Sequence, residues 1–218
     1  MMRLLFLIAA AMCAVLPVVP GYAVNLELKE VEIDRSPEVL RRGAAAVVNV
    51  CLNCHSLKYV KYRNLLDLGF TQAQVDNLRG GREMGGALLS VTPAEINITA
   101  YGIAPPDLSL MTRARECGPR YIYTLLSSFY EDKDGATNNR LFPGIKMPDV
   151  LGVGSIRDSG QRAEVDATLR SVAVFLDWVA DPHAGARRRL GYYVIAYMVL
   201  LTSLLYLLKR RIWSRLDH

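Results

Sequence analysis

The chain has 218 residues and a mass of 24.2 kDa, which is room for one ordinary domain with extra segments but not for two full domains. With 22% charged and 51% hydrophobic residues it is neither a disordered acidic tail nor a low-complexity chain, and four cysteines are too few for a disulfide scaffold. The formal net charge of +5 comes from the ends of the chain, because residues 24–186 hold 18 bases and 20 acids. A nucleic-acid binder carries its positive charge on the folded domain, so we expect no nucleic-acid partner.

The first 23 residues have the layout of a secretory signal peptide. One arginine precedes an apolar run over residues 4–19, and Gly21 and Ala23 put small residues at the −3 and −1 positions of a cleavage site. We predict a signal peptide over residues 1–23, with a retained signal anchor as the alternative. Cys13 does not indicate a lipoprotein, because a methionine precedes it. Few arginines and no serine-rich pattern argue against a mitochondrial transit peptide, so the chain looks bacterial.

A second apolar run, residues 190–208, holds 19 residues without a charge. At 1.5 Å per residue it spans about 28 Å, close to the roughly 30 Å core of a bilayer. Charged blocks at both ends disfavour a buried core helix. We predict a transmembrane anchor over residues 187–209. The flanking charges nearly balance, so the signal peptide decides the orientation: residues 24–186 form a periplasmic domain at the bacterial inner membrane, and residues 210–218 a cytoplasmic tail.

The exported domain is predicted to be mostly α-helical. The helical patterns cover Pro37–Val50, with Ser36 as N-cap, Arg120–Tyr130 and Val165–Val179. Residues 78–110 and 132–154 are rich in glycine and proline and are predicted to be mostly loop. Strand signals are scarce. We therefore expect a mostly α domain whose long loops wrap around something other than its own side chains.

Cys51-Leu52-Asn53-Cys54-His55 is a C-x-x-C-H motif, the attachment pattern of c-type haem. Two thiols about one helical turn apart can add to the two vinyl groups of a porphyrin, and His55 then offers a nitrogen to the iron. A redox dithiol would need a thioredoxin-like βαβ setting, and a zinc site would need a second cysteine pair. The sequence has neither, so it predicts one covalent haem c.

The second axial ligand is narrowed by elimination. His183, in the linker before the membrane, and His218, on the cytoplasmic side, cannot easily reach the ring. Of the three methionines in the domain, Met147 is favoured because prolines on both sides stiffen its loop. Met84 lies in a glycine-rich loop, and Met111 is better suited to packing. Ligation by His and Met fills both axial positions, which favours electron transfer over catalysis on a bound molecule.

Several motifs occur in a characteristic order along the mature chain. They are Arg41-Arg42-Gly43, Val50 to Ser56, Tyr59-Val60, Tyr62 to Leu65, Ala104-Pro105-Pro106-Asp107-Leu108-Ser109, Arg113-Ala114-Arg115, Tyr121, Phe142-Pro143-Gly144, Met147-Pro148 and Phe175-Leu176-x-Trp178. With these motifs the sequence resembles the cytochrome c1 family, the haem-bearing subunits of the cytochrome bc1 complex (quinol–cytochrome c reductase). The P-P-D-L-S loop is the most specific of them.

The resemblance implies a role for each matching residue. It implies thioether anchors at Cys51 and Cys54, axial iron ligands at His55 and Met147, a haem propionate partner at Arg115 with Tyr121 in the same polar cluster, and a haem wall at Pro105 and Pro106. The segment between Leu65 and Ala104 is short for the family. Cys117 has no partner once Cys13 is removed, so we expect a free thiol rather than a disulfide.

The resemblance also implies the partners. The chain would be the redox subunit of quinol–cytochrome c oxidoreductase, without substrate turnover of its own. It would take electrons from a Rieske iron–sulfur protein, pass them to a c-type cytochrome, and dock its membrane helix on cytochrome b within a dimeric complex. The alternative with the same cofactor is a membrane-tethered c-type cytochrome that feeds a terminal oxidase. A peroxidase with an open iron site and a haem-independent membrane adaptor are further alternatives.

Overall fold

The computed structural model describes residues 27–214. The predicted signal peptide with Cys13, and His218 in the predicted cytoplasmic tail, lie outside the described residues.

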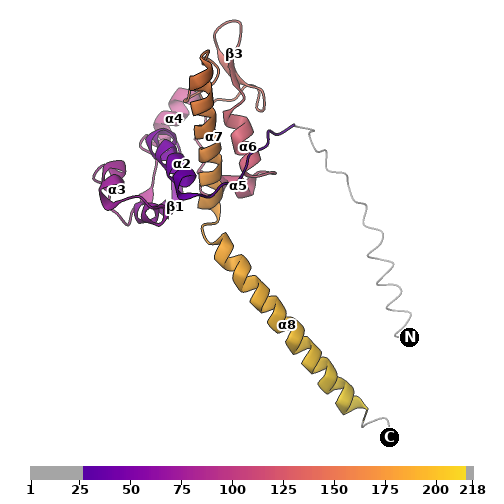
Figure 1. Cartoon of the computed structure of the whole chain (residues 1–218). Coiled ribbons are helices and arrows are strands. Elements are labelled where there is room, and N and C mark those ends of the chain that lie inside the picture. The colour runs from indigo at the N-terminus through magenta and orange to yellow at the C-terminus, as the bar shows by residue number, and fades with distance from the viewer. Residues whose placement is uncertain (1–26, 215–218) are drawn as a thin grey trace.

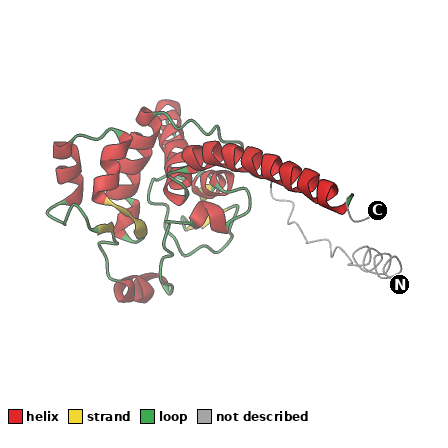
Figure 2. Ribbon diagram, turned by 90° about the horizontal axis from the view of Figure 1, so that it is seen from below, coloured by secondary structure: helices red, strands yellow, loops and turns green. Residues whose placement is uncertain are grey.

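The described chain folds mostly into helices that are joined by long loops, which confirms the predicted fold class (Figures 1 and 2). The α-helices are α2 (Pro37–Asn49), α3 (Gln72–Arg79), α4 (Ala94–Tyr101), α5 (Met111–Ala114), α6 (Pro119–Leu126), α7 (Ser159–Ala180) and α8 (Ala184–Trp213). Short 3-10 helices cover Cys51–Asn53 (η1) and Tyr62–Leu68 (η2). Strands β1 (Leu57–Lys61) and β2 (Ala87–Leu88) form one antiparallel pair, and β3 (Phe129–Glu131) and β4 (Thr137–Asn139) form another.

The three helices predicted for the domain are present with shifted ends. Helix α2 ends one residue early, and α6 ends at Leu126 because β3 begins three residues later. Helix α7 starts six residues earlier than predicted, where Asp158 caps it by accepting a hydrogen bond from the Gln161 amide at 2.8 Å. Ser36 occupies the N-cap position of α2, but its hydroxyl donates to Asp34 Oδ2 at 3.0 Å instead of capping the helix.

The prediction of loop for most of residues 78–110 is wrong over α4, and α3 was not predicted. Helix α4 has no one-sided apolar face: Ile96 and Ile98 are exposed while Asn97 is buried. Helix α3 buries only Val75 and depends on a capping box in which Thr71 and Gln74 bond to each other's backbone. Neither helix produces the apolar periodicity by which longer helices are recognised.

The core of the domain is built where α2 crosses α7, with α6 on the other side of α7 (Figure 1). At the crossing, Gly43 packs so closely that a Cβ atom there would lie 2.1 Å from the Ser171 carbonyl oxygen and 2.7 Å from Phe175 Cβ. Only glycine permits this approach. Ala44 and Val47 of α2 are fully buried beside it. Because Cys51 follows α2 directly, this crossing positions the C-x-x-C-H motif.

Helix α8 projects away from the domain (Figures 1 and 2). Pro182, which cannot continue a helix, separates it from α7. Among the described residues, α8 is the one helix long and apolar enough to cross a membrane, with a mean hydropathy of 1.8 over its most apolar window. It buries only Ala184 against the domain. The predicted C-terminal apolar helix is therefore confirmed, and it extends beyond the apolar run at both ends.

Candidate functional site

One cavity of about 290 Å³ brings together all the residues predicted for the site. They line it from distant parts of the chain: Cys51, Cys54, His55, Pro105, Pro106, Arg115, Tyr121 and Met147. Val172 and Leu176 of α7 also line the cavity, as do Ile122 and Leu125 of α6. The walls are mostly apolar, which suits a large flat hydrophobic group with a few polar contacts.

The two cysteines are held by a tight turn that follows α2. The amides of Cys54 and His55 donate to the Cys51 carbonyl oxygen at 3.1 and 2.8 Å, so the motif forms one compact turn. Burial, and to a smaller extent the neighbouring Cys54, raise the pKa of the Cys51 thiol to about 11. Redox-active C-x-x-C motifs work with a lowered thiol pKa. This environment therefore disfavours a redox dithiol.

His55 is oriented by the backbone carbonyl of Pro106, a residue that also lines the cavity. Its Nδ1 lies 2.7 Å from the Pro106 oxygen, and because a carbonyl only accepts, Nδ1 carries the proton and Nε2 keeps its lone pair. Burial lowers the pKa of His55, although the Pro106 hydrogen bond and the Asp107 carboxylate act in the opposite direction. A neutral imidazole whose second nitrogen is fixed in this way is suited to bind a metal ion.

The P-P-D-L-S loop is tied to the segment that follows the motif. The Leu108 amide donates to the Ser56 carbonyl oxygen at 2.8 Å, and Asp107 accepts from the amides of Lys58 and Ser109 at 3.1 and 2.9 Å. Buried Ser109 accepts in turn from the Tyr59 amide at 3.2 Å. Pro105 and Pro106 both line the cavity. No sequence pattern indicates that the Pro106 carbonyl holds His55.

Two of the three candidate methionines line the cavity. Met147 and Met111 do, whereas Met84 is not among the lining residues. The cavity alone therefore leaves both thioethers as candidates, and the rigid proline-flanked loop still favours Met147. His183 stands at the N-cap of α8 and is not among the lining residues either.

Two asparagines that the sequence analysis did not single out hold the loop of Met147. Asn139 is fully buried; it donates to the Leu125 carbonyl oxygen at 2.7 Å and accepts from the amides of Leu141 and Phe142 at 2.9 and 3.1 Å. Asn138 accepts from the Gly144 amide at 2.9 Å. Asparagine before a proline–glycine turn often binds the backbone in this way, which is the signal that could have found them.

Arg115 and Tyr121 meet at the edge of the cavity. The Arg115 guanidinium lies over the Tyr121 ring, 5.7 Å from its centroid, and both residues line the cavity. The exposed guanidinium supplies a positive charge at the rim of an apolar cavity, where an anionic substituent of a bound group would need one. Nearby Cys117 is exposed and, among the described cysteines, none forms a disulfide.

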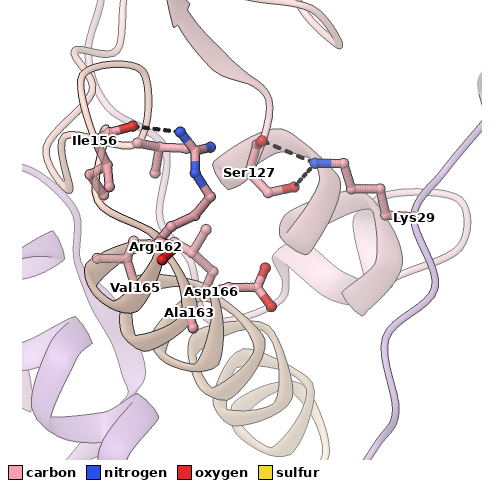
Figure 3. A pocket seen from close by; sticks show the side chains of 10 residues that line it. Lys29, Ser127, Ile156, Arg162, Ala163, Val165 and Asp166 are labelled. Carbon is pink, nitrogen blue, oxygen red and sulfur yellow. Dashed lines mark hydrogen bonds between the residues drawn. The ribbon is translucent and has the colours of Figure 1, made fainter.

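A second cavity, of about 390 Å³, lies outside this site, between the N-terminal segment, α6 and the first half of α7 (Figure 3). There Lys29 donates to the Ser127 carbonyl oxygen and hydroxyl at 3.0 and 2.8 Å, and Arg162 donates to the Ile156 carbonyl oxygen. This cavity contains none of the predicted site residues. The bonds of Lys29 join the N-terminal segment to the end of α6, whereas the bond of Arg162 joins the start of α7 to the segment that leads into it.

Comparison with known proteins agrees with the motifs. The profile of the Cytochrome C1 family matches residues 33–86 and 92–216. Cytochrome c1 of Allochromatium vinosum is 32% identical over 224 residues, covering 89% of this chain and 91% of that protein. Cytochrome c1 of Rhodospirillum rubrum is 33% identical over 223 residues, covering 82% of each chain. Cytochrome b/c1 of Bradyrhizobium diazoefficiens is 32% identical over 225 residues, covering 80% of this chain but only 33% of that longer protein. The resemblance stated from the motifs is confirmed: the chain belongs to the cytochrome c1 family.

Proposed function

We propose that this chain is the haem-bearing electron-transfer subunit of a bacterial cytochrome bc1 complex. Family membership implies a haem cofactor and a place in that complex. The observation that carries the proposal is the meeting of Cys51, Cys54, His55 and Met147 in one apolar cavity, although Met147 lies more than ninety residues after the cysteines.

The donor set fits one covalently attached haem c. Two adjacent thiols would form the thioether links, and the neutral His55 imidazole and the Met147 thioether would be the axial ligands. Such a group supplies one-electron oxidation and reduction. The Cys51 thiol is protonated at neutral pH, because burial raises its pKa to about 11.

The chain's own residues would tune that chemistry. Pro106 holds the His55 ring and increases the basicity of its free nitrogen by accepting the Nδ1 proton in a hydrogen bond. Apolar side chains such as Val172 and Leu176 exclude water, and a thioether ligand in a dry site raises the reduction potential. Arg115 would pair with a propionate at the rim, with Tyr121 beneath its guanidinium.

The anchor and the order of electron transfer complete the proposal. Helix α8 would cross the inner membrane and hold the domain on the periplasmic side. A place beside cytochrome b is supported by the name of one relative, cytochrome b/c1. Electrons would arrive from a Rieske iron–sulfur protein and leave to a c-type cytochrome, within a dimeric complex. Because His55 and Met147 would both hold the iron, the subunit would transfer electrons and bind no substrate there.

Purification from membranes in mild detergent tests the proposal. We expect a positive pyridine haemochrome assay, cytochrome b in the same fraction and antimycin-sensitive quinol oxidation. The double variant Cys51→Ala/Cys54→Ala should lose the covalent haem, whereas Cys117→Ala, which removes an exposed thiol, should keep it. Co-purification with a terminal oxidase in place of cytochrome b would support the tethered-cytochrome alternative. Covalent haem retained in the double variant would contradict the assigned anchors.

A further inference from the structure

The junction between α7 and α8 contains a buried carboxylate. Asp181 is the C-cap of α7 and is only 7% exposed. Its amide donates to the Trp178 carbonyl oxygen at 3.0 Å, and its own carbonyl oxygen accepts from the Ala184 amide at 3.3 Å. Asp181 is therefore attached through its backbone to the end of one helix and the start of the next.

The carboxylate of Asp181 binds arginines from two different elements. Arg187, in the first turns of α8, donates Nη1 to Oδ1 at 2.7 Å and Nη2 to Oδ2. Arg113, on α5, donates Nη2 to Oδ2 at 3.1 Å. A two-pronged guanidinium–carboxylate contact fixes direction as well as distance, which a single ammonium contact does not.

The charge state of Asp181 agrees with this arrangement. The hydrogen bonds from Arg187 lower the pKa of the carboxyl group, and the charge of Arg113 lowers it further. The group is therefore ionised at any physiological pH. A buried carboxylate of this kind depends on its cationic partners, since removing a partner leaves an uncompensated charge.

Little else in the described structure holds α8 to the domain. Ala184 is the only residue of α8 buried against it, and two of the three residues of the link, Pro182 and His183, are exposed. A three-residue link with so little packing would act as a hinge. The contact with Arg113 also connects this junction to the cavity, because Arg113 lies two residues before Arg115 at the rim.

We propose that Asp181 is a positioning residue, which fixes the direction of α8 relative to the haem domain by binding Arg187 and Arg113 together. The inference deepens the proposed function and rests on it for its purpose: a clamped helix sets the place of the redox group above the membrane. The geometry of the clamp itself does not depend on whether haem is bound.

Distance measurements in the full-length protein test the clamp. In a background with Cys13→Ala, one spin label is attached to the exposed Cys117 and a second to Ser203→Cys on α8, and the haem-loaded protein is placed in lipid nanodiscs. Asp181→Asn should broaden the distance distribution between the two labels about twofold, because it removes the charge that holds both arginines. The matched control is Asp177→Asn, one turn earlier on α7, whose partner Arg35 at 2.5 Å belongs to the domain and not to α8. The control should leave the distribution unchanged.

A second variant keeps the test decisive if Asp181→Asn fails to fold. The side chain of Arg187 is 66% exposed, so Arg187→Gln should leave the domain intact and still broaden the distribution. Haem content and midpoint potential should stay at the parent values in all variants, which separates loss of position from loss of structure. The inference would be overturned if the distance distribution stayed unchanged in Arg187→Gln and in any folded Asp181→Asn. It would also be overturned if Asp177→Asn broadened the distribution as much as these variants do. A parent protein without haem would instead refute the proposed function. Cys51 and Cys54 would then be free thiols, and replacing both with alanine before labelling would keep the distance measurement as a test of the clamp.

Discussion

The two walls of the cavity are supported in different ways. On the wall that carries the cysteines and His55, backbone groups hold the side chains in place. The Cys51 carbonyl closes the turn, and the Pro106 carbonyl orients the imidazole. On the wall that carries Met147, a loop without regular structure is held by the side chains of Asn138 and Asn139. The first wall should therefore tolerate most side-chain substitutions around it but not a shift of its helices. The second wall should be disrupted by substitution of a single supporting side chain.

The largest effect is expected where α2 meets α7 behind the cysteine wall. In Gly43→Ala the new Cβ would lie 2.1 Å from the Ser171 carbonyl oxygen, so the helices must separate. We expect the free energy of unfolding to fall by about 3 kcal/mol and the yield of covalent haem to fall with it. Urea unfolding in detergent, followed by circular dichroism, measures the first. Gly185→Ala on α8, where no atom lies within 4 Å of the added Cβ, is the control and should cause no loss. Equal stability of the two variants would show that the walls do not depend on this crossing.

The next effect distinguishes the two methionines that line the cavity. Met147→Leu preserves volume but removes the thioether, so we expect the midpoint potential to drop by roughly 0.1 V or more, together with a change in the spin state of the iron. Met111→Leu makes the same chemical change at a lining residue on α5 and should shift the potential far less. Potentiometry on both proteins decides between them. If Met111→Leu had the larger effect, the iron ligand would be Met111 on α5, and the Met147 loop would only line the cavity.

The loop anchors should have a smaller but selective effect. Asn139→Ala removes three hydrogen bonds at a fully buried side chain, and we expect a loss of about 2 kcal/mol of stability. Because the loop carries Met147, cyanide should displace the methionine more readily in this variant. Asn138→Ala removes a bond to the Gly144 amide at a half-buried position, so it should follow the same trend to a lesser degree. If cyanide affinity did not change in either variant, the loop would not be what holds the ligand.

The same contrast explains what the sequence could predict. The cysteine wall is encoded in five consecutive residues, and Met147 is marked by its flanking prolines, so both walls could be located without a structure. The backbone carbonyl of Pro106 could not be foreseen, because every residue has one and only the fold brings it to His55. The asparagine anchors had only a weak local signal.

Longer-range features were missed for a related reason. Asp181 and Arg113 are 68 positions apart, and no local pattern records that they meet. Helix α4 was missed because its apolar residues do not gather on one face, so its formation depends on local context rather than on periodicity. The long helices α2, α7 and α8 were predicted because each has an extended pattern of its own.

The smallest effect concerns α6, which connects the Met147 loop to α7. Its Leu125 carbonyl binds Asn139, and it is attached to α7 by Tyr123, whose hydroxyl donates to Asp166 Oδ1 at 2.6 Å and accepts from Arg170 Nη2 at 2.7 Å. Burial, and then the hydrogen bond to Asp166, raises the pKa of Tyr123 from 10.0 to about 12. The folded protein therefore keeps this proton at a pH where the unfolded chain loses it, so the stabilisation by Tyr123 is complete below pH 10 and is lost as the pH rises towards 12. We expect the stability difference between the parent and Tyr123→Phe, measured by urea unfolding, to be constant from about pH 7 to 9 and to shrink above pH 10. A difference that stayed constant to pH 12 would mean that the Tyr123–Asp166 hydrogen bond does not hold α6 on α7. The position of the Met147 loop would then depend on Asn138 and Asn139 and not on this bond.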